Sequence, residues 1–162
     1  MSEQSTIQWD DLNGSEKEAI DLIQAFCENA GLNLSPVVHN INPPYLDVEL
    51  VGDDAESTFG RSGKGLDALQ YLLNLIVSKQ SNGSVRVTLD AAGYRARRVV
   101  ILEALARECV ENVLERQEEC ELDPLPAHER RIVHNILSEY PEIRTYSEGE
   151  DPDRRVIIAP RA

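Results

Sequence analysis

Apolar residues recur along the first half of the chain with two different periods. They return every three or four positions over residues 15–30, and again from residue 66 to about residue 79, which predicts two amphipathic helices. Shorter stretches are rich in β-branched residues or alternate between apolar and polar positions. These predict three strands, at residues 33–41, 46–50 and 85–89.

The first helix has a recognisable start, because Ser15 and Glu18 have the spacing of a capping box. Residues 52–58 lead through a short helical segment into a glycine-rich loop, and residues 1–14 are polar and are expected to form a disordered tail. The predicted order is therefore helix, strand, strand, short helix, loop, helix and strand.

The second half of the chain also mixes helices and strands. Its longest segment, residues 94–116, carries one uninterrupted apolar stripe and is expected to be a helix. A short strand, a helix and two further strands are predicted after it, at residues 120–125, 127–137, 143–147 and 154–159. Because no Gly-, Pro- or Ser-rich linker separates the halves, we expect an α/β (α+β) fold of two small domains joined by the long helix. The expected boundaries are residues 15–92 and 93–162.

The glycine-rich loop runs from Gly60 to Gly65 and precedes a helix. Glycines let the backbone approach a ligand closely, and a helix start offers unpaired N–H groups to anions. A Walker loop is excluded because Leu66 stands where Lys is needed, and the order G-x-x-G-x-G is not that of a dinucleotide fingerprint. Two interpretations remain: the G-x-x-G loop of a KH domain, which clamps a nucleotide backbone, or an ordinary turn at a helix start.

The net charge of −13 argues against a nucleic-acid-binding protein until its distribution is considered. Residues 1–58 carry one basic and twelve acidic residues, whereas residues 59–116 carry nine basic and six acidic ones. Residues 117–162 carry six basic and eleven acidic residues. Local fields rather than the total charge steer a polyanion, and the basic block begins at the glycine loop. This distribution predicts a modest, salt-sensitive affinity for nucleic acid.

Composition also bears on the compartment and the chemistry. No apolar run approaches 18 residues and the N-terminus lacks the features of a signal peptide, so we expect a cytoplasmic protein with no membrane span. Cys27, Cys109 and Cys120 form no Cys-x-x-Cys pair, which predicts reduced thiols and argues against zinc. We expect no metal and no cofactor. Motifs typical of hydrolases, such as G-x-S-x-G and H-E-x-x-H, do not occur, so we expect no enzyme.

Four motifs in order carry a resemblance to a known family. They are GRSGKGLDALQYLLNLIV, LDAAGYRARR, HERRIVHNIL and TYSEGEDPDRRVII, and the third contains Arg130 and His134 at the spacing of an R-x-x-x-H motif. Together they resemble the Jag family of bacterial proteins over about residues 15–162. Members of that family join a type II KH domain to an R-x-x-x-H domain that binds single-stranded nucleic acid. The predicted order of helices and strands before residue 92 is that of a type II KH domain.

The resemblance implies a role in RNA binding, usually as a post-transcriptional regulator. It also implies a partner, a small separate KH-domain protein, and a link to growth of the cell envelope. Family members often carry an extra N-terminal Jag domain and a linker. We expect this chain to have neither, which argues against a membrane-proximal or envelope role.

Candidate site residues follow from the two motifs. The KH loop supplies Gly60, Arg61, Ser62, Gly63 and Lys64, whose backbone, hydroxyl and cations suit phosphates. The R-x-x-x-H domain supplies Arg130, His134, Arg131, Arg154 and Arg155. Arg130 is expected on the polar side of its helix, binding phosphate bidentately. His134 either contacts a base or phosphate or is a histidine with a local partner. Further phosphate contacts are expected from Arg95, Arg97 and Arg98, unless these residues serve only solubility.

Two functions remain after these arguments. The first is a non-enzymatic single-stranded RNA-binding protein. The alternative is a protein-interaction adaptor in which RNA binding is weak or vestigial, and the acidic residues 1–58 favour it.

Overall fold

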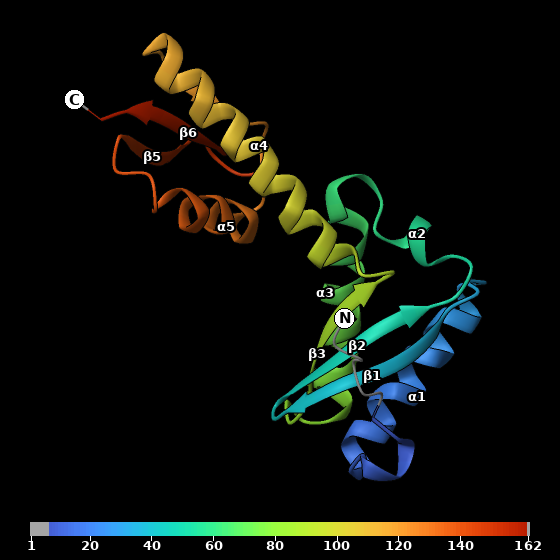
Figure 1. Ribbon diagram of the computed structural model, residues 1–162. Helices are drawn as coiled ribbons and strands as arrows, with labels where there is room; N and C mark the ends of the chain where they lie inside the picture. The colour runs from blue at the N-terminus through green and yellow to red at the C-terminus, as the bar shows by residue number, and fades with distance from the viewer. Residues whose placement is uncertain (1–6, 162) are drawn as a thin grey trace. The chain divides into compact units, whose positions relative to one another are not determined.

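The computed structural model describes residues 7–161 of the 162-residue chain, apart from the side chain of Arg61. It divides into two compact units, one ending at Arg95 and the other beginning at Ala96. Each unit contains helices and a three-stranded sheet (Figure 1). The α/β class predicted from the sequence is therefore confirmed.

The first unit has the order of helices and strands predicted for a type II KH domain. Its elements are α1 (Gly14–Asn29), β1 (Ser35–Asn42), β2 (Tyr45–Val51), α2 (Ala55–Thr58), the 3₁₀ helix η2 (Arg61–Gly63), α3 (Lys64–Gln80) and β3 (Arg86–Ala91). The sheet order is β1-β2-β3, with β1 antiparallel and β3 parallel to the central β2. The glycine loop stands between the two helices α2 and α3, as expected.

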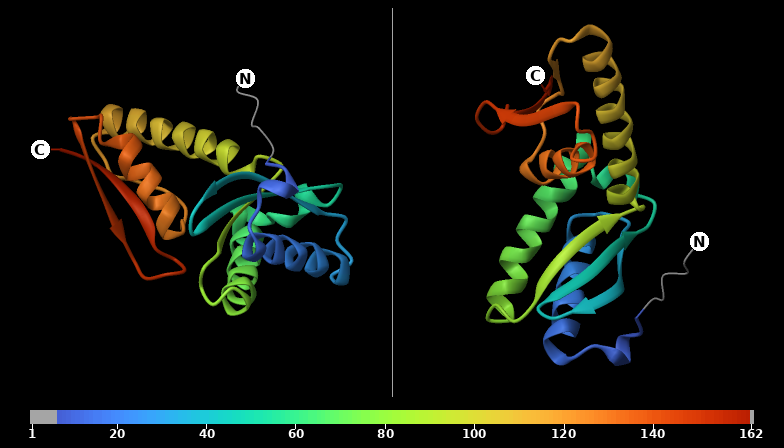
Figure 2. Two further views of the ribbon diagram at one scale, coloured as in Figure 1. Left: turned by 90° about the horizontal axis from the view of Figure 1, so that it is seen from below. Right: turned by 60° about the vertical axis from the view of Figure 1, so that its left-hand side comes forward.

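One face of this sheet builds the hydrophobic core. Along β2, Leu46, Val48 and Leu50 are buried and alternate with more exposed residues, because successive side chains of a strand point to opposite faces. Apolar residues of α1, such as Ile23, and of α3, such as Leu73, join the same buried cluster. Both helices therefore cover the same face of the sheet, as Figures 1 and 2 show.

Side-chain amides of α3 bind the outer edge of β3. The Asn74 amide donates to the Val87 carbonyl at 2.7 Å and accepts from the Val87 N–H at 2.7 Å. One turn earlier, the Gln70 Oε1 accepts from the Leu89 N–H at 2.8 Å. An edge strand otherwise presents unpaired backbone groups to other chains. These amides satisfy several of those groups and fix α3 along the sheet edge.

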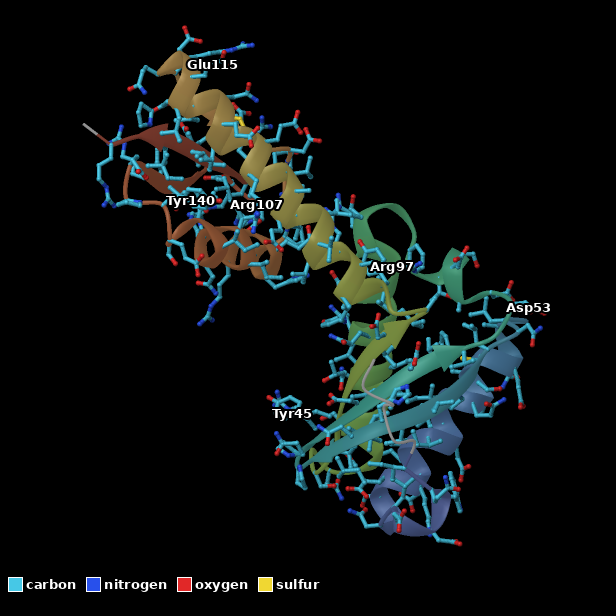
Figure 3. All side chains as sticks on the ribbon, viewed as in Figure 1. Tyr45, Asp53, Arg97, Arg107, Glu115 and Tyr140 are labelled. Carbon is cyan, nitrogen blue, oxygen red and sulfur yellow. A yellow bond between two sulfur atoms is a disulfide. The ribbon has the colours of Figure 1, made fainter. Side chains whose placement is uncertain are left out.

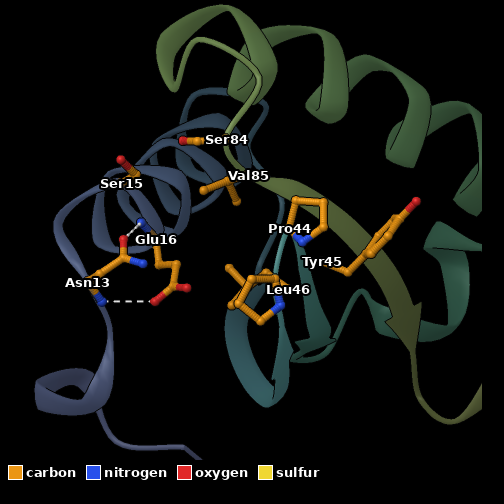
Figure 4. A pocket seen from close by; sticks show the side chains of 9 residues that line it. Asn13, Ser15, Glu16, Pro44, Tyr45, Leu46, Ser84 and Val85 are labelled. Atoms are coloured by element: carbon orange, nitrogen blue, oxygen red, sulfur yellow. Dashed lines mark hydrogen bonds between the residues drawn. The ribbon is translucent and has the colours of Figure 1, made fainter.

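The N-terminal segment differs from the prediction in two ways. The disordered tail expected over residues 1–14 is wrong for residues 7–13, because the Ile7 N–H donates to the Val38 carbonyl at 2.9 Å and Leu12 is buried. Residues 1–6 lie outside the described part of the chain. The capping box also begins two residues earlier than expected: Asn13 accepts from the Glu16 N–H, and Glu16 accepts from the Asn13 N–H (Figure 4).

The second unit contains two helices and a small antiparallel sheet. Helix α4 (Tyr94–Arg116) begins in the first unit and continues into the second. It is followed by β4 (Cys120–Glu121), α5 (Ala127–Leu137), β5 (Ile143–Glu148) and β6 (Arg155–Pro160), with the sheet order β4-β6-β5. Leu102 and Val113 of α4, Val133 of α5 and Ile158 of β6 meet in one core. Within residues 7–161, no helix is long and apolar enough to cross a membrane.

Two further links hold this unit together. The Arg98 guanidinium donates to both carboxylate oxygens of Glu129, at 2.8 and 3.0 Å, and so ties α4 to α5. Cys109 and Cys120 form a disulfide between α4 and β4, which corrects the expectation that all three cysteines are reduced. Their spacing contains no pairing signal, because only the fold brings Cys109 of α4 beside Cys120 of β4. Cys27 is a free, buried thiol whose pKa burial raises.

The contact between α3 and the segment before it generates a first prediction. A Cβ added at Gly65 would lie 2.6 Å from the Thr58 carbonyl oxygen, a backbone atom that has little room to move. We expect Gly65→Ala to destabilise the first unit by about 1–3 kcal/mol. Urea unfolding followed by the fluorescence of Trp9, the sole tryptophan, measures the change. Gly14→Ala is the control, because its Cβ would meet nothing within 4 Å. Equal stability of both variants would contradict the prediction.

The buried ion pair of the second unit generates another prediction. Glu129 is only 2% exposed, so Glu129→Ala leaves the Arg98 guanidinium largely buried without its carboxylate. We expect a loss of about 3 kcal/mol of stability, since a buried charge that loses its partner is strongly destabilising. Glu103→Ala, which breaks an exposed pair with Arg107, should change stability by less than about 1 kcal/mol. Hydrogen exchange of the α5 and β6 amides distinguishes them, and similar effects would refute the assignment.

Candidate nucleic-acid interface

The G-x-x-G loop of the first unit has a left-handed backbone. Gly60, Ser62 and Gly63 have φ values of 60°, 57° and 75°. Only glycine adopts such angles without a steric cost, and Ser62 is among the few described non-glycine residues with positive φ. The loop therefore makes a tight turn directly before the first residue of α3.

Gly63 is required by contact as well as by conformation. A Cβ there would lie 2.6 Å from the Cε1 atom of Tyr94, whose ring stacks on Phe59 with centroids 4.6 Å apart. The aromatic pair thus supports one side of the loop, while Ser62 and Lys64 are exposed to solvent. Gly63 is also the N-cap of α3 and provides no side-chain cap. No side chain of Gly63 therefore competes with an anion for the N–H groups at the start of α3, although the Gly65 N–H already donates to the Phe59 carbonyl at 3.1 Å.

The three arginines at the start of α4 have different environments. Arg95 donates to the Leu89 carbonyl and to Gln70, and it pairs with Asp67 at 3.4 Å. Arg98 is held by Glu129, as described above. Arg97 is exposed. Phosphate contacts from Arg95 and Arg98 would require these internal bonds to be broken, so the structure favours a structural role for both.

A groove runs along the first unit beside the glycine loop. Its volume is about 400 Å³, and it lies between α3 and the strands β2 and β3. It is lined by residues that include Tyr45, Asp67, Gln70, Tyr71, Asn74 and Arg86. Tyr45 projects outward from the start of β2 (Figure 3). Asp67 lies in the first turn of α3, so one end of the groove lies at the part of the helix that directly follows the loop.

Sequence reasoning missed the tyrosines and the arginine of this groove. Tyr71 is 66% exposed and Tyr45 is 48% exposed. Burial would be expected for both, because Tyr71 lies within an amphipathic helix and Tyr45 lies directly before an alternating strand. Arg86 is exposed and has no ion-pair partner within residues 7–161. A signal for Arg86 was present, because it is the polar residue of an alternating strand in the basic block. Nothing in the sequence identified Tyr45 as its neighbour across the sheet.

A second candidate site surrounds His134 on α5. Its ring nitrogens lie 2.7 Å from the Thr145 hydroxyl and 3.0 Å from the Ser147 hydroxyl, both on β5. Burial and the nearby charge of Arg130 lower the pKa of His134 below its ordinary value of 6.5. The imidazole is therefore neutral at pH 7, with one nitrogen donating and the other accepting. Thr145 and Ser147 were not predicted, because the pairing of α5 with β5 is a tertiary contact.

Arg130 does not lie on an exposed polar face, which corrects the helical-wheel expectation. The residue is 7% exposed, and its Nη1 donates to the Leu125 carbonyl and to the Asp151 carboxylate, both at 2.7 Å. Its hydrogen bond holds the pKa of the Asp151 carboxyl below its ordinary value of 3.8. Arg130 thus ties the start of α5 to the loop between β5 and β6. Helical periodicity gave the wrong exposure for Arg130 because that loop covers the polar side of the helix.

The other three arginines predicted as site residues in this unit have different environments. Arg155 pairs with Glu121 on the neighbouring β4, so its charge is used within the sheet. Arg154 is partly buried, and its Nε has no hydrogen-bond partner within the described chain. Arg131 is exposed on α5, three positions before His134. Among the predicted residues, Arg131 is the one whose position best suits a phosphate from solvent.

Comparisons with known proteins bear on both units. The R-x-x-x-H domain family, named for an arginine and a histidine separated by three residues, matches residues 96–160. RNA-binding protein KhpB of Clostridium symbiosum is 36% identical over 146 residues, which cover 89% of this chain and 65% of that protein. RNA-binding protein KhpB of Bacillus subtilis is 35% identical over 112 residues, covering 68% of this chain and 54% of that protein.

A further relative, RNA-binding protein KhpB of Lactiplantibacillus plantarum, is 35% identical over 102 residues, covering 63% of this chain and 32% of that protein. The chain thus spans less than two thirds of the length of each of these curated relatives. The region matched by the domain family includes Arg130, His134 and both of the strands β5 and β6. These matches confirm the resemblance to the Jag-type proteins that the four motifs predicted, with an R-x-x-x-H domain at residues 96–160.

Proposed function

We propose that this chain is a non-enzymatic, cytoplasmic protein that binds single-stranded RNA and acts as a post-transcriptional regulator. The observation that carries the proposal is the left-handed G-x-x-G turn at an uncapped helix start, in a chain whose relatives are named RNA-binding proteins. The match to the R-x-x-x-H domain family adds a second region for nucleic acid. Residues 15–92 act as the KH domain and residues 93–162 as the R-x-x-x-H domain.

The KH loop binds the sugar-phosphate backbone. Gly60 and Gly63 expose backbone to the ligand, and the N–H groups at the start of α3 meet a phosphate. Lys64 and the Ser62 hydroxyl are exposed beside this turn and add a cation and a donor. Arg61 contributes a further cation by its place in the sequence. Loops of this kind clamp about four nucleotides, whose bases then lie along the groove beside α3.

The surface around His134 binds RNA less through charge than the KH loop does. A neutral His134 cannot attract phosphate as a cation, and both of its ring nitrogens are bonded to Thr145 and Ser147, so it serves as a stacking group for a base. Arg131 provides the exposed charge on the same helix. Arg130 acts as a positioning residue, since it anchors Asp151 and the loop that borders His134. We therefore revise its role from phosphate ligand to support of the surface.

The adaptor alternative is favoured by the acidic residues 1–58, which repel RNA and suit a basic protein surface. The small KH-domain protein implied by the family resemblance is the partner we would test first. Such a partnership is compatible with RNA binding, because neither Asp47 nor Glu49 is among the residues that line the groove beside α3.

A double substitution in the loop tests the RNA-binding proposal. Arg61→Asp combined with Ser62→Asp places two anions where a phosphate should bind, and Asp tolerates the φ of 57° at position 62. We expect wild-type affinity for a 12-nucleotide single-stranded RNA to fall with salt, with a log–log slope of about −0.7 per phosphate contact. The double variant should lose at least about tenfold in affinity. Fluorescence anisotropy across a salt series measures both.

The outcome separates the two functions. The double variant must unfold at the same temperature as the wild type for its loss of binding to be informative. Arg131→Ala is the matched probe of the surface around His134 and should have a smaller effect. If no single-stranded RNA binds, or if neither variant changes RNA binding, the adaptor function replaces this proposal. An affinity that salt does not change would instead remove the electrostatic part of the proposal.

The lowered pKa of His134 generates a pH prediction for the second unit. The unfolded chain binds the proton near pH 6.5, whereas the folded chain binds it only at lower pH. Stability contributed by the neutral imidazole is therefore present above pH 6.5 and is lost as the pH falls through the interval below it. His134→Gln keeps a donor and an acceptor without titrating. Unfolding measured from pH 7.5 to 5.5 should show the wild type losing stability relative to this variant; parallel curves would exclude the effect.

A further inference from the structure

The amide of Gln70 has a fixed orientation in the groove. Its Oε1 accepts from two groups, the Leu89 N–H at 2.8 Å and the Arg95 Nη2 at 3.0 Å. Both partners are donors that cannot accept, so they assign the oxygen without ambiguity. The Nε2 group must then occupy the other side of the amide. None of the described residues accepts a hydrogen bond from Nε2, and Gln70 lines the groove.

The other amide of the groove is used differently. Asn74 donates both of its N–H groups, to the Gln70 carbonyl at 3.1 Å and to the Val87 carbonyl at 2.7 Å. It has no donor left for a ligand. Hydroxyl groups that line the groove, on Ser78 and Thr88, rotate and can donate or accept. Gln70 therefore provides a donor that cannot change into an acceptor.

The surroundings of Gln70 suit a nucleotide base. Tyr71, the next residue, and Tyr45 both line the groove and expose their rings, and base–aromatic stacking contributes about 1–3 kcal/mol per base. Arg86, beside Tyr45 in the sheet, places a cation at the same groove. The groove begins one turn after the glycine loop that holds the backbone in the proposed function. Bases attached to that backbone can thus reach Gln70.

We propose that Gln70 is a specificity-determining residue that makes this groove prefer keto bases, uracil and guanine, over amino bases, cytosine and adenine. The inference rests on the proposed RNA-binding function. The keto oxygen at C4 of uracil or C6 of guanine accepts a hydrogen bond from the fixed Nε2 donor, whereas the amino group at the same position of cytosine or adenine is itself a donor. A donor that is covered by a base and faces another donor remains unpaired, and this mismatch lowers affinity.

Twelve-residue oligomers of uridine and of cytidine provide the cleanest comparison. Their bases are the same size and differ in the exocyclic group at C4 and in the proton on N3. Since one hydrogen bond contributes roughly 1 kcal/mol, we expect the wild-type protein to bind the uridine oligomer about fivefold more tightly. Fluorescence anisotropy at one salt concentration measures the ratio. Equal affinity, or tighter binding of the cytidine oligomer, would overturn the inference.

The variant Gln70→Glu replaces the hydrogen-bond donor with an acceptor and keeps the hydrogen bonds that fix the side chain. One carboxylate oxygen still accepts from Leu89 and Arg95, and the other replaces the donor with an acceptor. We expect the preference to reverse, so that the cytidine oligomer binds more tightly. Ala68→Glu is the control, since it adds the same charge at an exposed position of α3 that does not line the groove. The control should weaken both oligomers and keep the uridine preference.

The possible outcomes distinguish a failure of this inference from a failure of the proposed RNA-binding function. If Gln70→Glu folds and keeps the uridine preference, Gln70 does not read the base and the inference fails. If that variant does not fold, the wild-type ratio alone decides. If the wild type binds neither oligomer nor a mixed-sequence RNA, the proposed function fails and this inference fails with it. Loss of both oligomers in the Arg61→Asp, Ser62→Asp variant, with a wild-type uridine preference, supports both.

Discussion

The attachment of α3 to the edge of β3 is the interaction on which the first unit depends. Asn74 and Gln70 bind backbone groups of Val87 and Leu89, so the helix cannot slide along the strand without breaking several hydrogen bonds. This register places the start of α3, and therefore the glycine loop, against Tyr94. It also closes the sheet edge to a further strand. The groove is consequently a surface for side-chain contacts with a ligand, and strand addition there would require the amides to leave.

Several of the arginines that the sequence offered as contacts for RNA are used in internal ion pairs. Arg95, Arg98, Arg130 and Arg155 each bind a carboxylate of their own unit. Counting cations along the sequence therefore overstates the field available to RNA. The exposed Lys64, Arg86 and Arg131 remain as better candidates, and all three lie beside the loop, the groove or His134. A net charge of −13 agrees with an affinity that depends on hydrogen bonds and stacking as well as on the local cations.

The sequence predicted the elements well because periodicity is a local property. Helices at 94–116 and 127–137 were predicted with the observed bounds, and the order of the first unit was predicted from alternation and glycines. What it could not provide were contacts between elements. The burial of Arg130 depends on a loop about twenty residues away, and the hydroxyl partners of His134 come from β5. The disulfide was missed because only the fold brings Cys109 beside Cys120. The capping box was assigned to Ser15 and Glu18 because two pairs with the same spacing overlap there, and Asn13 and Glu16 form the box.

The two candidate sites have complementary chemistry, which bears on how one chain would hold RNA. The loop and groove combine backbone N–H groups, a cation and fixed amides, so they depend on phosphate charge and on base edges. At the second site His134 is neutral and Arg131 is the exposed cation near it, so its contribution should respond less to salt than that of the loop and groove. Covalent linkage makes the second contact intramolecular once the first has formed, which raises the effective concentration of RNA at the second site. Two individually weak sites of this kind favour RNA segments long enough to contact both.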